Sequence, residues 1–314
     1  MFQVVELVIP LFGLIFLGYL AGRFKQIPTA GLAWMNFFIV NVALPALFFN
    51  LLAKTPVSEF ANGRFLLSTT LGTFLIFALC FLIARKLRKA DIREATVQGF
   101  AGAYGNIGYM GPPLAIAAFG PQAGVPVALV FCLDNAMHFT LAPSLMAMGS
   151  KRLDSVMKLV GGIVYKIFSH PFILATLAGI VAALFEFSPP TPVQSLLDSL
   201  SNAAAPCALF VMGVTTALRP LKRVPLELTY LVPIKLLVHP ALMYLLLAQI
   251  PGLDPVWLHA AVLLAALPSA TNVFVIAQHY GVWEERASSA VVISTGLSIF
   301  SVTTYLYLAN AGYL

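Results

Sequence analysis

Ionisable side chains stand inside long apolar stretches of this sequence, where a charge is costly and usually marks function. Asp134, Asn135 and His138 lie within the apolar residues 124–148, and a spacing of four places Asp134 and His138 on one helix face. Two interpretations stand: a proton or cation site, or a buried polar cluster that closes a helix contact. A zinc pair is a poorer interpretation, because no third ligand has a matching spacing.

Lys235 lies within a second apolar stretch, residues 228–249. Three interpretations are open for its ammonium group: an ion pair with Asp134, contact with the carboxylate of a bound anion, or snorkelling to the membrane surface. His239 follows one helical turn later, and both His239 and His170 precede a proline. We expect these two histidines to be hydrogen-bonded packing residues.

Glycine and proline interrupt an apolar stretch at residues 104–120, which read Tyr-Gly-Asn-Ile-Gly-Tyr-Met-Gly-Pro-Pro and onward. Proline lacks an amide hydrogen and disturbs the preceding turn, so Gly111 and Pro113 predict a broken helix. Unsatisfied backbone in hydrocarbon costs several kcal/mol per group, so a break survives only inside protein or beside a water-filled cavity. A break at membrane depth is therefore a candidate binding site, the alternative being a kinked structural helix.

A second interruption of the same kind is predicted at residues 265–281. Pro268 stands in mid-stretch, and Ser269, Thr271 and Asn272 are residue types that cap helices. The alternative to a ligand-binding role for these three side chains is simple capping of the following helix.

The two interruptions occupy equivalent places in an internal repeat. A shift of the chain by 161 positions superimposes several glycines, prolines and asparagines without a gap. The matched pairs are Pro10 with Pro171, Gly18 with Gly179, Asn41 with Asn202, Pro45 with Pro206, and Gly120 with Gly281. A fixed period of this kind indicates a duplicated unit.

Composition sets the class of protein that carries these motifs. The chain is 60% hydrophobic and only 10% charged, which excludes an ordinary soluble domain and predicts an all-α polytopic membrane protein. We predict ten membrane spans, at residues 4–22, 34–53, 65–84, 96–119, 124–148, 168–187, 200–218, 228–249, 257–280 and 286–311. Residues 1–150 form the first five-helix repeat, 151–166 a cytoplasmic linker, and 167–314 the second repeat.

Basic residues are distributed unevenly between the two sets of connections. Those after odd-numbered spans hold fifteen lysines and arginines, whereas the opposite connections hold only Lys54 and Arg64. The basic side is cytoplasmic by the positive-inside rule, so both termini are predicted to lie outside the cytoplasm. Each repeat has an odd number of spans, so the second repeat enters the membrane inverted.

Inverted repeats bring the fourth and ninth spans to cross at mid-membrane. The helices that begin after the two breaks then point their N-termini toward one place, and each N-terminus carries roughly half a positive charge. We predict an anion site there, formed by Gly105, Asn106, Gly111 and Pro113 on one side and by Pro268, Ser269, Thr271 and Asn272 on the other. Asn41 and Asn202 either reach the substrate or satisfy carbonyls that Pro45 and Pro206 leave free.

These motifs resemble those of the auxin efflux carrier family. The resemblance lies in Gly-Asn-Ile-Gly-Tyr-Met-Gly-Pro-Pro-Leu at 105–114 and in Ala-Ala-Leu-Pro at 265–268. It implies a fold similar to bile acid–sodium symporters, with a scaffold of spans 1, 2, 6 and 7 and a mobile transport domain of the other six spans that moves as an elevator. It also implies that Asn106 and Pro268 are crossover residues. Gly105 replaces a proline that plant members usually have, and the linker is short, so the chain resembles a bacterial member of the inner membrane.

The expected function is secondary transport of a small organic anion, a mono- or dicarboxylate such as malonate or an auxin-like acid. H⁺, Na⁺ or no coupling ion remains open, with Asp134, Asn135, His138 and Lys235 as candidate coupling residues. We expect no enzyme activity, no metal or other cofactor and no nucleic-acid partner; the lipid bilayer is a partner, and a homodimer is possible. A channel-like uniporter on the same fold and an intramembrane enzyme using Asp134 and His138 are the alternatives.

Overall fold

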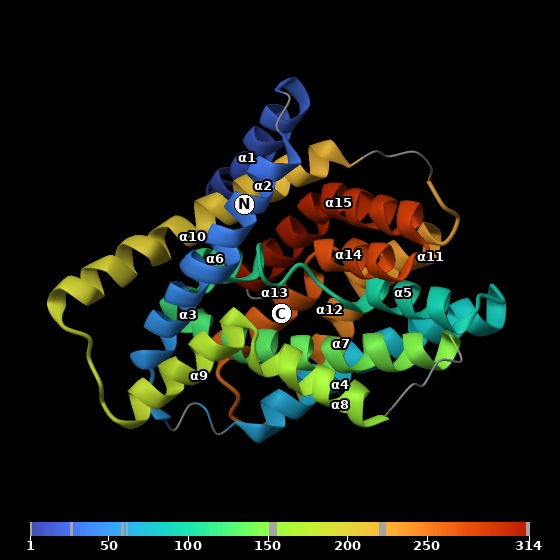
Figure 1. The fold of residues 1–314 in the computed structure, drawn as a ribbon. Helices are drawn as coiled ribbons and strands as arrows, with labels where there is room; N and C mark the ends of the chain where they lie inside the picture. The colour runs from blue at the N-terminus through green and yellow to red at the C-terminus, as the bar shows by residue number, and fades with distance from the viewer. Residues whose placement is uncertain are drawn as a thin grey trace.

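The computed structural model describes residues 2–25, 28–57, 60, 62–150, 156–219 and 224–311, and these residues form an all-helical fold (Figure 1). Its first half comprises α1 (Phe2–Phe24), α2 (Thr29–Phe38), η1 (Ile39–Ala43), α3 (Leu44–Ala53), α4 (Gly63–Leu82), η3 (Ile83–Leu87), α5 (Ile92–Ala103), α6 (Gly111–Phe119), η4 (Pro121–Ala123) and α7 (Gly124–Ser150). The second half comprises α8 (Val156–Phe168), α9 (Pro171–Leu184), α10 (Thr191–Leu218), α11 (Leu228–Pro233), η5 (Ile234–Val238), α12 (His239–Leu247), α13 (Pro255–Ala266), α14 (Thr271–Tyr280) and α15 (Glu284–Asn310).

Six helical segments in the described part of the chain are long and apolar enough to cross a bilayer. They are Ala30–Ala53, Gly63–Leu87, Pro121–Ser150, Thr191–Leu218, Leu228–Leu247 and Glu284–Asn310. These segments confirm the prediction of an all-α polytopic membrane protein. Helices also occupy the other four ranges predicted as spans, but α5, α6, α13 and α14 are each shorter than a full span.

The predicted linker between the repeats is largely helical. Residues 151–155 lie outside the described residues, and α8 follows them and meets α9 at a bend of 60°. The sequence of α8 is apolar apart from two glycines, Lys158 and Lys166, which suits an amphipathic helix at a membrane interface rather than an irregular loop.

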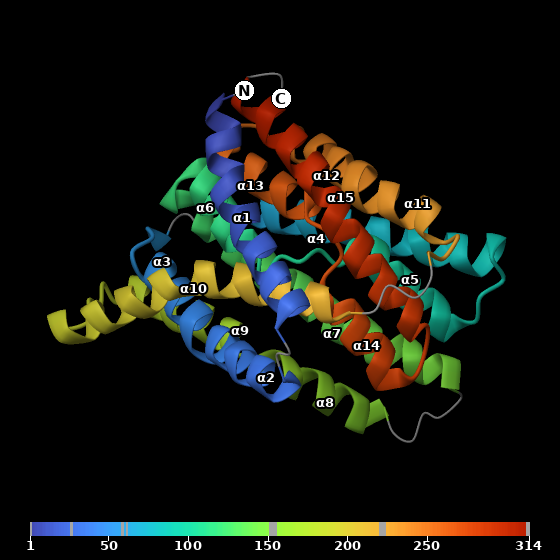
Figure 2. The same ribbon diagram turned by 90° about the horizontal axis from the view of Figure 1, so that it is seen from above.

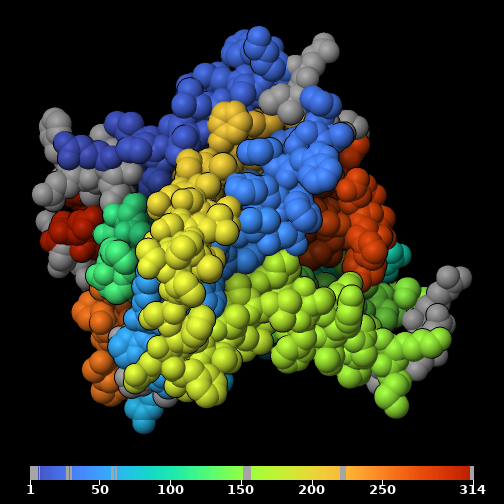
Figure 3. Space-filling model, turned by 60° about the vertical axis from the view of Figure 1, so that its left-hand side comes forward, coloured from blue at the N-terminus to red at the C-terminus, as the bar shows by residue number. Residues whose placement is uncertain are grey.

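The helices pack in two groups. In the first group α1 lies along α10, and α3 lies against both α9 and α10. In the second group α4, α5, α7 and α11 to α15 pack on one another, with α12 between α4 and α13. Figure 3 shows the face of the first group, where the blue α2–α3 segment lies beside the yellow α10 and the yellow-green α9.

Glycine permits the closest helix contacts of the first group. A Cβ atom on Gly18 of α1 would lie 2.0 Å from the carbonyl oxygen of Phe210 in α10, so no larger residue fits there. Gly179 of α9 lies against α3 in a similar way, where its Cβ would stand 2.8 Å from Leu52 Cβ. The α1–α10 and α3–α9 contacts therefore use glycines that the shift of 161 residues superimposes.

Charged connections gather at one end of the molecule, on the right in Figures 1 and 2. Arg286 at the start of α15 forms ion pairs with Glu94 of α5 at 3.0 Å and with Glu227 before α11 at 2.9 Å. Arg93 donates a hydrogen bond to the carbonyl of Tyr280 at the end of α14. These contacts hold the connections after α4, α10 and α14 together at the same end of the second group.

Candidate functional site

Two interrupted helix pairs meet at the centre of the molecule. The chain is non-helical between α5 and α6 and again between α13 and α14, and Figure 2 shows α6 and α13 on one side of the crossing and α5 and α14 on the other. At the crossing the Asn106 amide donates to the Pro268 carbonyl at 2.8 Å, and the Ala270 amide donates to the Tyr104 carbonyl at 2.8 Å. This antiparallel exchange satisfies backbone groups that the breaks would otherwise leave unpaired in an apolar interior.

Side chains from the second break and from η5 cap the two helices that end at the crossing. Ser269 Oγ donates to the Ala101 carbonyl in the last turn of α5 at 2.6 Å, and the Ser269 amide donates to Ser294 Oγ at 3.1 Å. Lys235 Nζ donates to the Ala265 carbonyl in the last turn of α13 at 2.6 Å. Carbonyls at a helix end lack partners within the helix, so both contacts stabilise the broken ends.

A small cavity lies beside the crossing, with a volume of about 140 Å³. Its walls come from both breaks, the first turn of α14, η1, α7 and α9. The lining residues are Val40, Tyr104, Gly105, Asn106, Ile107, Gly108, Tyr109, Phe131, His170, Phe172, Ala270, Thr271 and Asn272. No aspartate or glutamate is among them, and the N-terminus of α14 opens into the cavity, so its electrostatics favour an anion.

Tyr104 connects the cavity to the polar residues of α7. Its hydroxyl donates to Asn135 Oδ1 at 2.6 Å and accepts from Asn272 Nδ2 at 2.9 Å. Its ring stacks on the ring of His138, with the centroids 3.9 Å apart. Asn135 and His138 therefore position a cavity residue without lining the cavity themselves.

Asp134 lies in the same buried region but makes few contacts. Its Oδ2 accepts a hydrogen bond from Thr73 Oγ1 at 3.2 Å, and its Oδ1 has no partner among the described residues. Asp134 and Lys235 are not within 4.0 Å of each other, so the ion pair that was one of the three open interpretations of Lys235 does not form.

Lys235 does not reach solvent or the cavity. Its side chain is fully buried, with 0% relative exposure, so the snorkelling interpretation is wrong. Contact with the carboxylate of an anion in the cavity is not supported either, because Lys235 is absent from the lining residues. Instead its Nζ lies between the Ala265 carbonyl and His239 Nδ1, at 2.6 and 3.1 Å.

The predicted anion-site residues divide into two sets. Gly105, Asn106, Thr271 and Asn272 line the cavity. The other four predicted residues do not line the cavity: Gly111, Pro113, Pro268 and Ser269. Gly111 instead packs closely on α13, since a Cβ atom there would lie 2.8 Å from Leu264 Cδ2.

The paired asparagines of the repeat do not line the cavity. Asn41 Nδ2 donates to the Phe37 carbonyl at 3.1 Å within its own helix, which is not a carbonyl that Pro45 leaves free, so this contact matches neither predicted role. Asn202 is exposed on α10. Val40, which precedes Asn41 in the π-helical turn η1, lines the cavity instead.

Several cavity residues escaped the sequence analysis. Tyr104, Tyr109, Phe131 and Phe172 are aromatic side chains in apolar stretches, a pattern that also fits ordinary packing. His170 was expected to be a packing residue, and it does contact the ring of Phe172, but it lines the cavity as well. One sequence feature could have indicated Tyr104 as a cavity residue: it is an aromatic residue directly before Gly105, the first glycine of the break.

A wider cavity of about 390 Å³ adjoins the first one. The two share Tyr104 and Asn272, and the wider cavity extends past Phe139 and Ile276 to Lys166, His279 and Tyr280. It therefore leads from the crossing toward the end of the molecule where the basic connections gather, and it carries a lysine near its far end.

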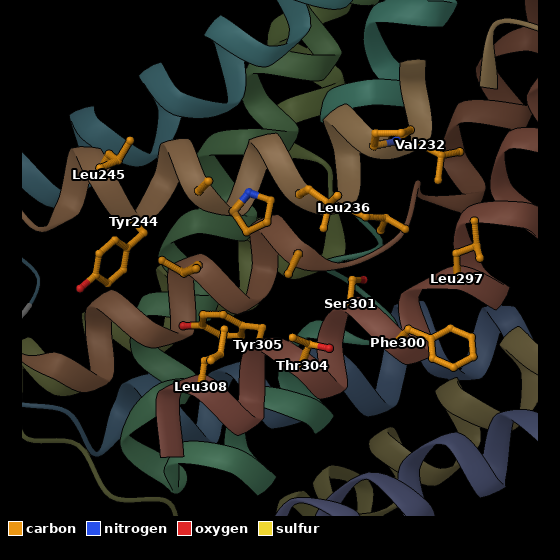
Figure 4. Close-up of a pocket in the computed structure, with 16 residues that line it drawn as sticks. Val232, Leu236, Tyr244, Leu245, Leu297, Phe300, Ser301, Thr304, Tyr305 and Leu308 are labelled. Carbon is orange, nitrogen blue, oxygen red and sulfur yellow. The ribbon is translucent and has the colours of Figure 1, made fainter. Parts of the chain in front are cut away.

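A larger groove of about 670 Å³ has a different character (Figure 4). It lies between α11–α12, α13 and α15, and its walls are aliphatic and aromatic with a few hydroxyl groups, such as those of Ser301 and Tyr305. No charged or amide side chain lines it, so it suits hydrocarbon rather than a small anion. The smaller cavity at the crossing is the better candidate site.

Comparison with known proteins gives a consistent assignment. A family model described as "Membrane transport protein" matches residues 3–306. A protein from Rhizobium meliloti (strain 1021) named "Putative malonate transporter" is 56% identical over 100% of this chain and 98% of its own length. Auxin efflux carrier component 1 of Arabidopsis thaliana is 30% identical over 45% of this chain and 23% of its own length. The lysosomal cholesterol signaling protein of Mus musculus is 26% identical over 91% of this chain and 35% of its own length.

Proposed function

The chain belongs to the membrane transport protein family, which includes the auxin efflux carriers, and from that premise we propose that it is a secondary carrier of a small dicarboxylate of the malonate type. The observation that carries this proposal is the acid-free cavity at the meeting of two broken helices. The name and 56% identity of the Rhizobium meliloti relative support malonate as the first substrate to test.

The cavity favours a substrate of few atoms. Its volume of about 140 Å³ is well below the roughly 300–1,000 Å³ of pockets that hold drug-sized ligands. One carboxylate of the substrate would accept hydrogen bonds from backbone amides in the first turn of α14, beside Thr271 and Asn272. Asn106 and the Tyr109 hydroxyl border the same space, although Tyr109 already donates to Asn36 Oδ1 at 2.8 Å.

The proposed carrier has ten membrane spans, arranged as two inverted repeats of five helices each. The repeat-related glycines support it, because Gly18 lies at the contact of predicted spans 1 and 7, and Gly179 at the contact of predicted spans 6 and 2. A twofold relation between the repeats exchanges these two contacts, as expected for inverted repeats.

Alternating access would move one helix group past the other. The cavity lies at their boundary, since Val40, His170 and Phe172 belong to the first group and residues 104–109 and 270–272 to the second. We propose that α1–α3, α9 and α10 form the scaffold, and that the second group carries the substrate as an elevator. The wider cavity that reaches Lys166 is the entrance in the conformation described here.

The orientation in the membrane follows from the basic residues. Arg85, Lys86, Arg88, Lys89 and Arg93 stand at the end of the molecule where Arg88 and Arg286 meet Glu227, and this end is proposed to be cytoplasmic. Four of the basic connection residues, Lys151, Arg152, Lys222 and Arg223, lie outside the described residues. In a bacterial cell both termini would then face the periplasm, with the protein in the inner membrane; a homodimer remains a prediction.

The alternatives have less support. An intramembrane enzyme using Asp134 and His138 would need both groups at a substrate site, but neither lines the cavity. Family membership also indicates transport rather than catalysis. A channel-like uniporter on the same fold would differ from a carrier in its transport kinetics, because a pore shows neither saturation nor counterflow.

Counterflow of radiolabelled malonate tests the proposed function. Purified protein in liposomes preloaded with unlabelled malonate should accumulate external labelled malonate transiently and saturably, since a carrier exchanges one bound molecule for another. A flux that neither saturates nor shows counterflow would indicate a pore and reject the carrier. No flux of malonate or of related dicarboxylates would reject the proposed substrate class.

A further inference from the structure

The wider cavity beside the crossing has a positively charged far end. Its lining includes one charged side chain, that of Lys166 in the last turn of α8. His279, in the last turn of α14, lines the same end and adds an imidazole to it. None of the described residues that line this cavity is an aspartate or a glutamate, so its walls do not repel an anion.

One face of α14 connects this far end with the small cavity at the crossing. Asn272, Ile276 and His279 recur at helical spacing, and Asn272 lines both cavities. Asn272 and His279 are seven residues apart, which is about 10 Å along a helix axis. A three-carbon dicarboxylate is shorter than this distance, so an anion beside Lys166 and an anion at the crossing occupy different places.

Lys166 is available to bind an anion. Its side chain is exposed, and it forms no ion pair with any residue in the part of the chain that the structure describes. The acidic side chains of Glu94 and Glu227 are paired with Arg286 instead. The charge of Lys166 is therefore not neutralised by these carboxylates.

Two arginines add to the positive charge around α14. Arg93 donates to the carbonyl of Tyr280, the last residue of α14, and so offsets the negative end of that helix where Tyr280 lines the wider cavity. Arg219 lies over the ring of Phe274, 4.6 Å from its centroid. The helix itself, Thr271–Tyr280, has no acidic side chain. The path from Lys166 to the crossing thus runs along a helix that three cations flank.

We propose that Lys166 and His279 form an entry site, which captures a dicarboxylate dianion at the mouth of the wider cavity before the anion moves to the crossing. This inference deepens the proposed function and rests on it for the identity of the ligand. The attraction to a fixed charge is proportional to the charge of the ligand, so a dianion gains about twice as much as a monoanion. Lys166 therefore favours dicarboxylates over monocarboxylates at the entrance.

A cysteine inside the wider cavity measures the potential that Lys166 creates there. Val275 lines this cavity and is half exposed, so Val275→Cys is introduced into a variant without the three native cysteines. An anionic and a cationic methanethiosulfonate reagent then modify the purified protein at low ionic strength. Adding Lys166→Gln should lower the ratio of the anionic to the cationic rate about threefold or more, whereas Lys166→Arg should preserve the ratio.

Lys158→Gln is the matched control for both assays. Lys158 belongs to the same helix, α8, but does not line the wider cavity. Its replacement removes the same charge from the same surface, so it should leave the rate ratio unchanged. A lysine that only snorkels at the membrane interface would behave like Lys158, so the comparison separates the entry site from that role.

Malonate uptake shows whether the entry site takes part in transport. In proteoliposomes at low ionic strength, Lys166→Gln should lower uptake about threefold or more at malonate concentrations below the KM, with the maximal rate unchanged. Lys158→Gln should transport as the wild-type protein does. The difference should vanish in concentrated potassium chloride, because the Debye length falls to about 3 Å at 1 M salt.

Two results would overturn the inference. The first is an unchanged rate ratio in Lys166→Gln, or an equal fall in Lys158→Gln, because either would show that Lys166 creates no local potential in the cavity. The second is wild-type uptake of malonate by Lys166→Gln at low ionic strength, because the site would then play no part in transport. If the wild-type protein takes up no malonate, the proposed function fails, and the rate ratio still decides whether Lys166 attracts anions.

Discussion

The backbone amide of Asn106 donates to the carbonyl of Pro268 at 2.8 Å, which joins the break of the first repeat to the break of the second. A proline that ends one helix thus accepts a hydrogen bond that a second interrupted helix needs. The reciprocal bond, from the Ala270 amide to the Tyr104 carbonyl, has the same length. The breaks are stable in an apolar interior because each satisfies the backbone of the other.

A negative charge at the start of α14 should weaken anion binding. Asn272→Asp places a carboxylate in the first helical turn, where the helix tolerates it well but a substrate anion is repelled. We expect the KM for malonate to rise about tenfold or more in proteoliposomes, with a smaller rise for Asn272→Ala, which loses only hydrogen bonds such as that to Tyr104. Equal KM values for the Asp and Ala variants would argue against an anion beside this residue.

The glycine contact between α1 and α10 should be intolerant of a methyl group. Gly18→Ala brings a Cβ atom to within 2.0 Å of the Phe210 carbonyl oxygen and should destabilise the protein by about 1–3 kcal/mol. Gly13→Ala in the same helix is the matched control, since no atom lies within 4 Å of the added Cβ. Thermal unfolding of both variants measures the difference, and equal melting temperatures would contradict the close contact.

The ion pairs of Arg286 should contribute a small, salt-dependent stabilisation. Arg286 is about half exposed, so Arg286→Gln should cost about 1 kcal/mol or less at low ionic strength. The loss should shrink as sodium chloride is raised, because exposed ion pairs are screened. Arg64→Gln, at an exposed position of α4, is the control. A large loss that persists at high salt would point to a different role for Arg286.

The proposed orientation predicts which loops a membrane-impermeant maleimide reaches. In a variant without the three native cysteines, Lys54→Cys should react in intact cells. Lys89→Cys, at a position that is also exposed, should react only after permeabilisation. The reverse pattern would place the basic connections outside and invert the topology.

Sequence patterns located the two breaks because proline and glycine impose them locally. Pro268 and the Gly111–Pro113 segment disturb a helix whatever surrounds it, and composition alone was enough to indicate a membrane protein. The cavity residues Asn106, Thr271 and Asn272 followed from their position next to those breaks. These features depend on short segments, so the sequence is sufficient to predict them.

The directions of buried side chains were not predictable in this way. Lys235 lies in the π-helical turn η5, which changes the directions of side chains relative to a regular α-helix. No local sequence motif predicts such a turn. Asn41 and Asn202 are equivalent in sequence, yet only the stretch around Asn41 adopts a π-helical turn and places a neighbour, Val40, in the cavity. Which face of a helix meets a cavity is decided by packing among distant segments, as the role of Tyr104 also shows.

Binding of malonate to the cavity at the crossing is tested most directly by thermal unfolding with and without the ligand. A ligand that binds only the folded protein stabilises it by about 2.7 kcal/mol at a concentration of 100 times its Kd. Malonate should therefore raise the melting temperature of the wild-type protein and of Asn202→Ala, whose residue is exposed on α10, but not of Asn106→Ala, whose residue lines the cavity. An equal rise in all three proteins would contradict a malonate site at the crossing.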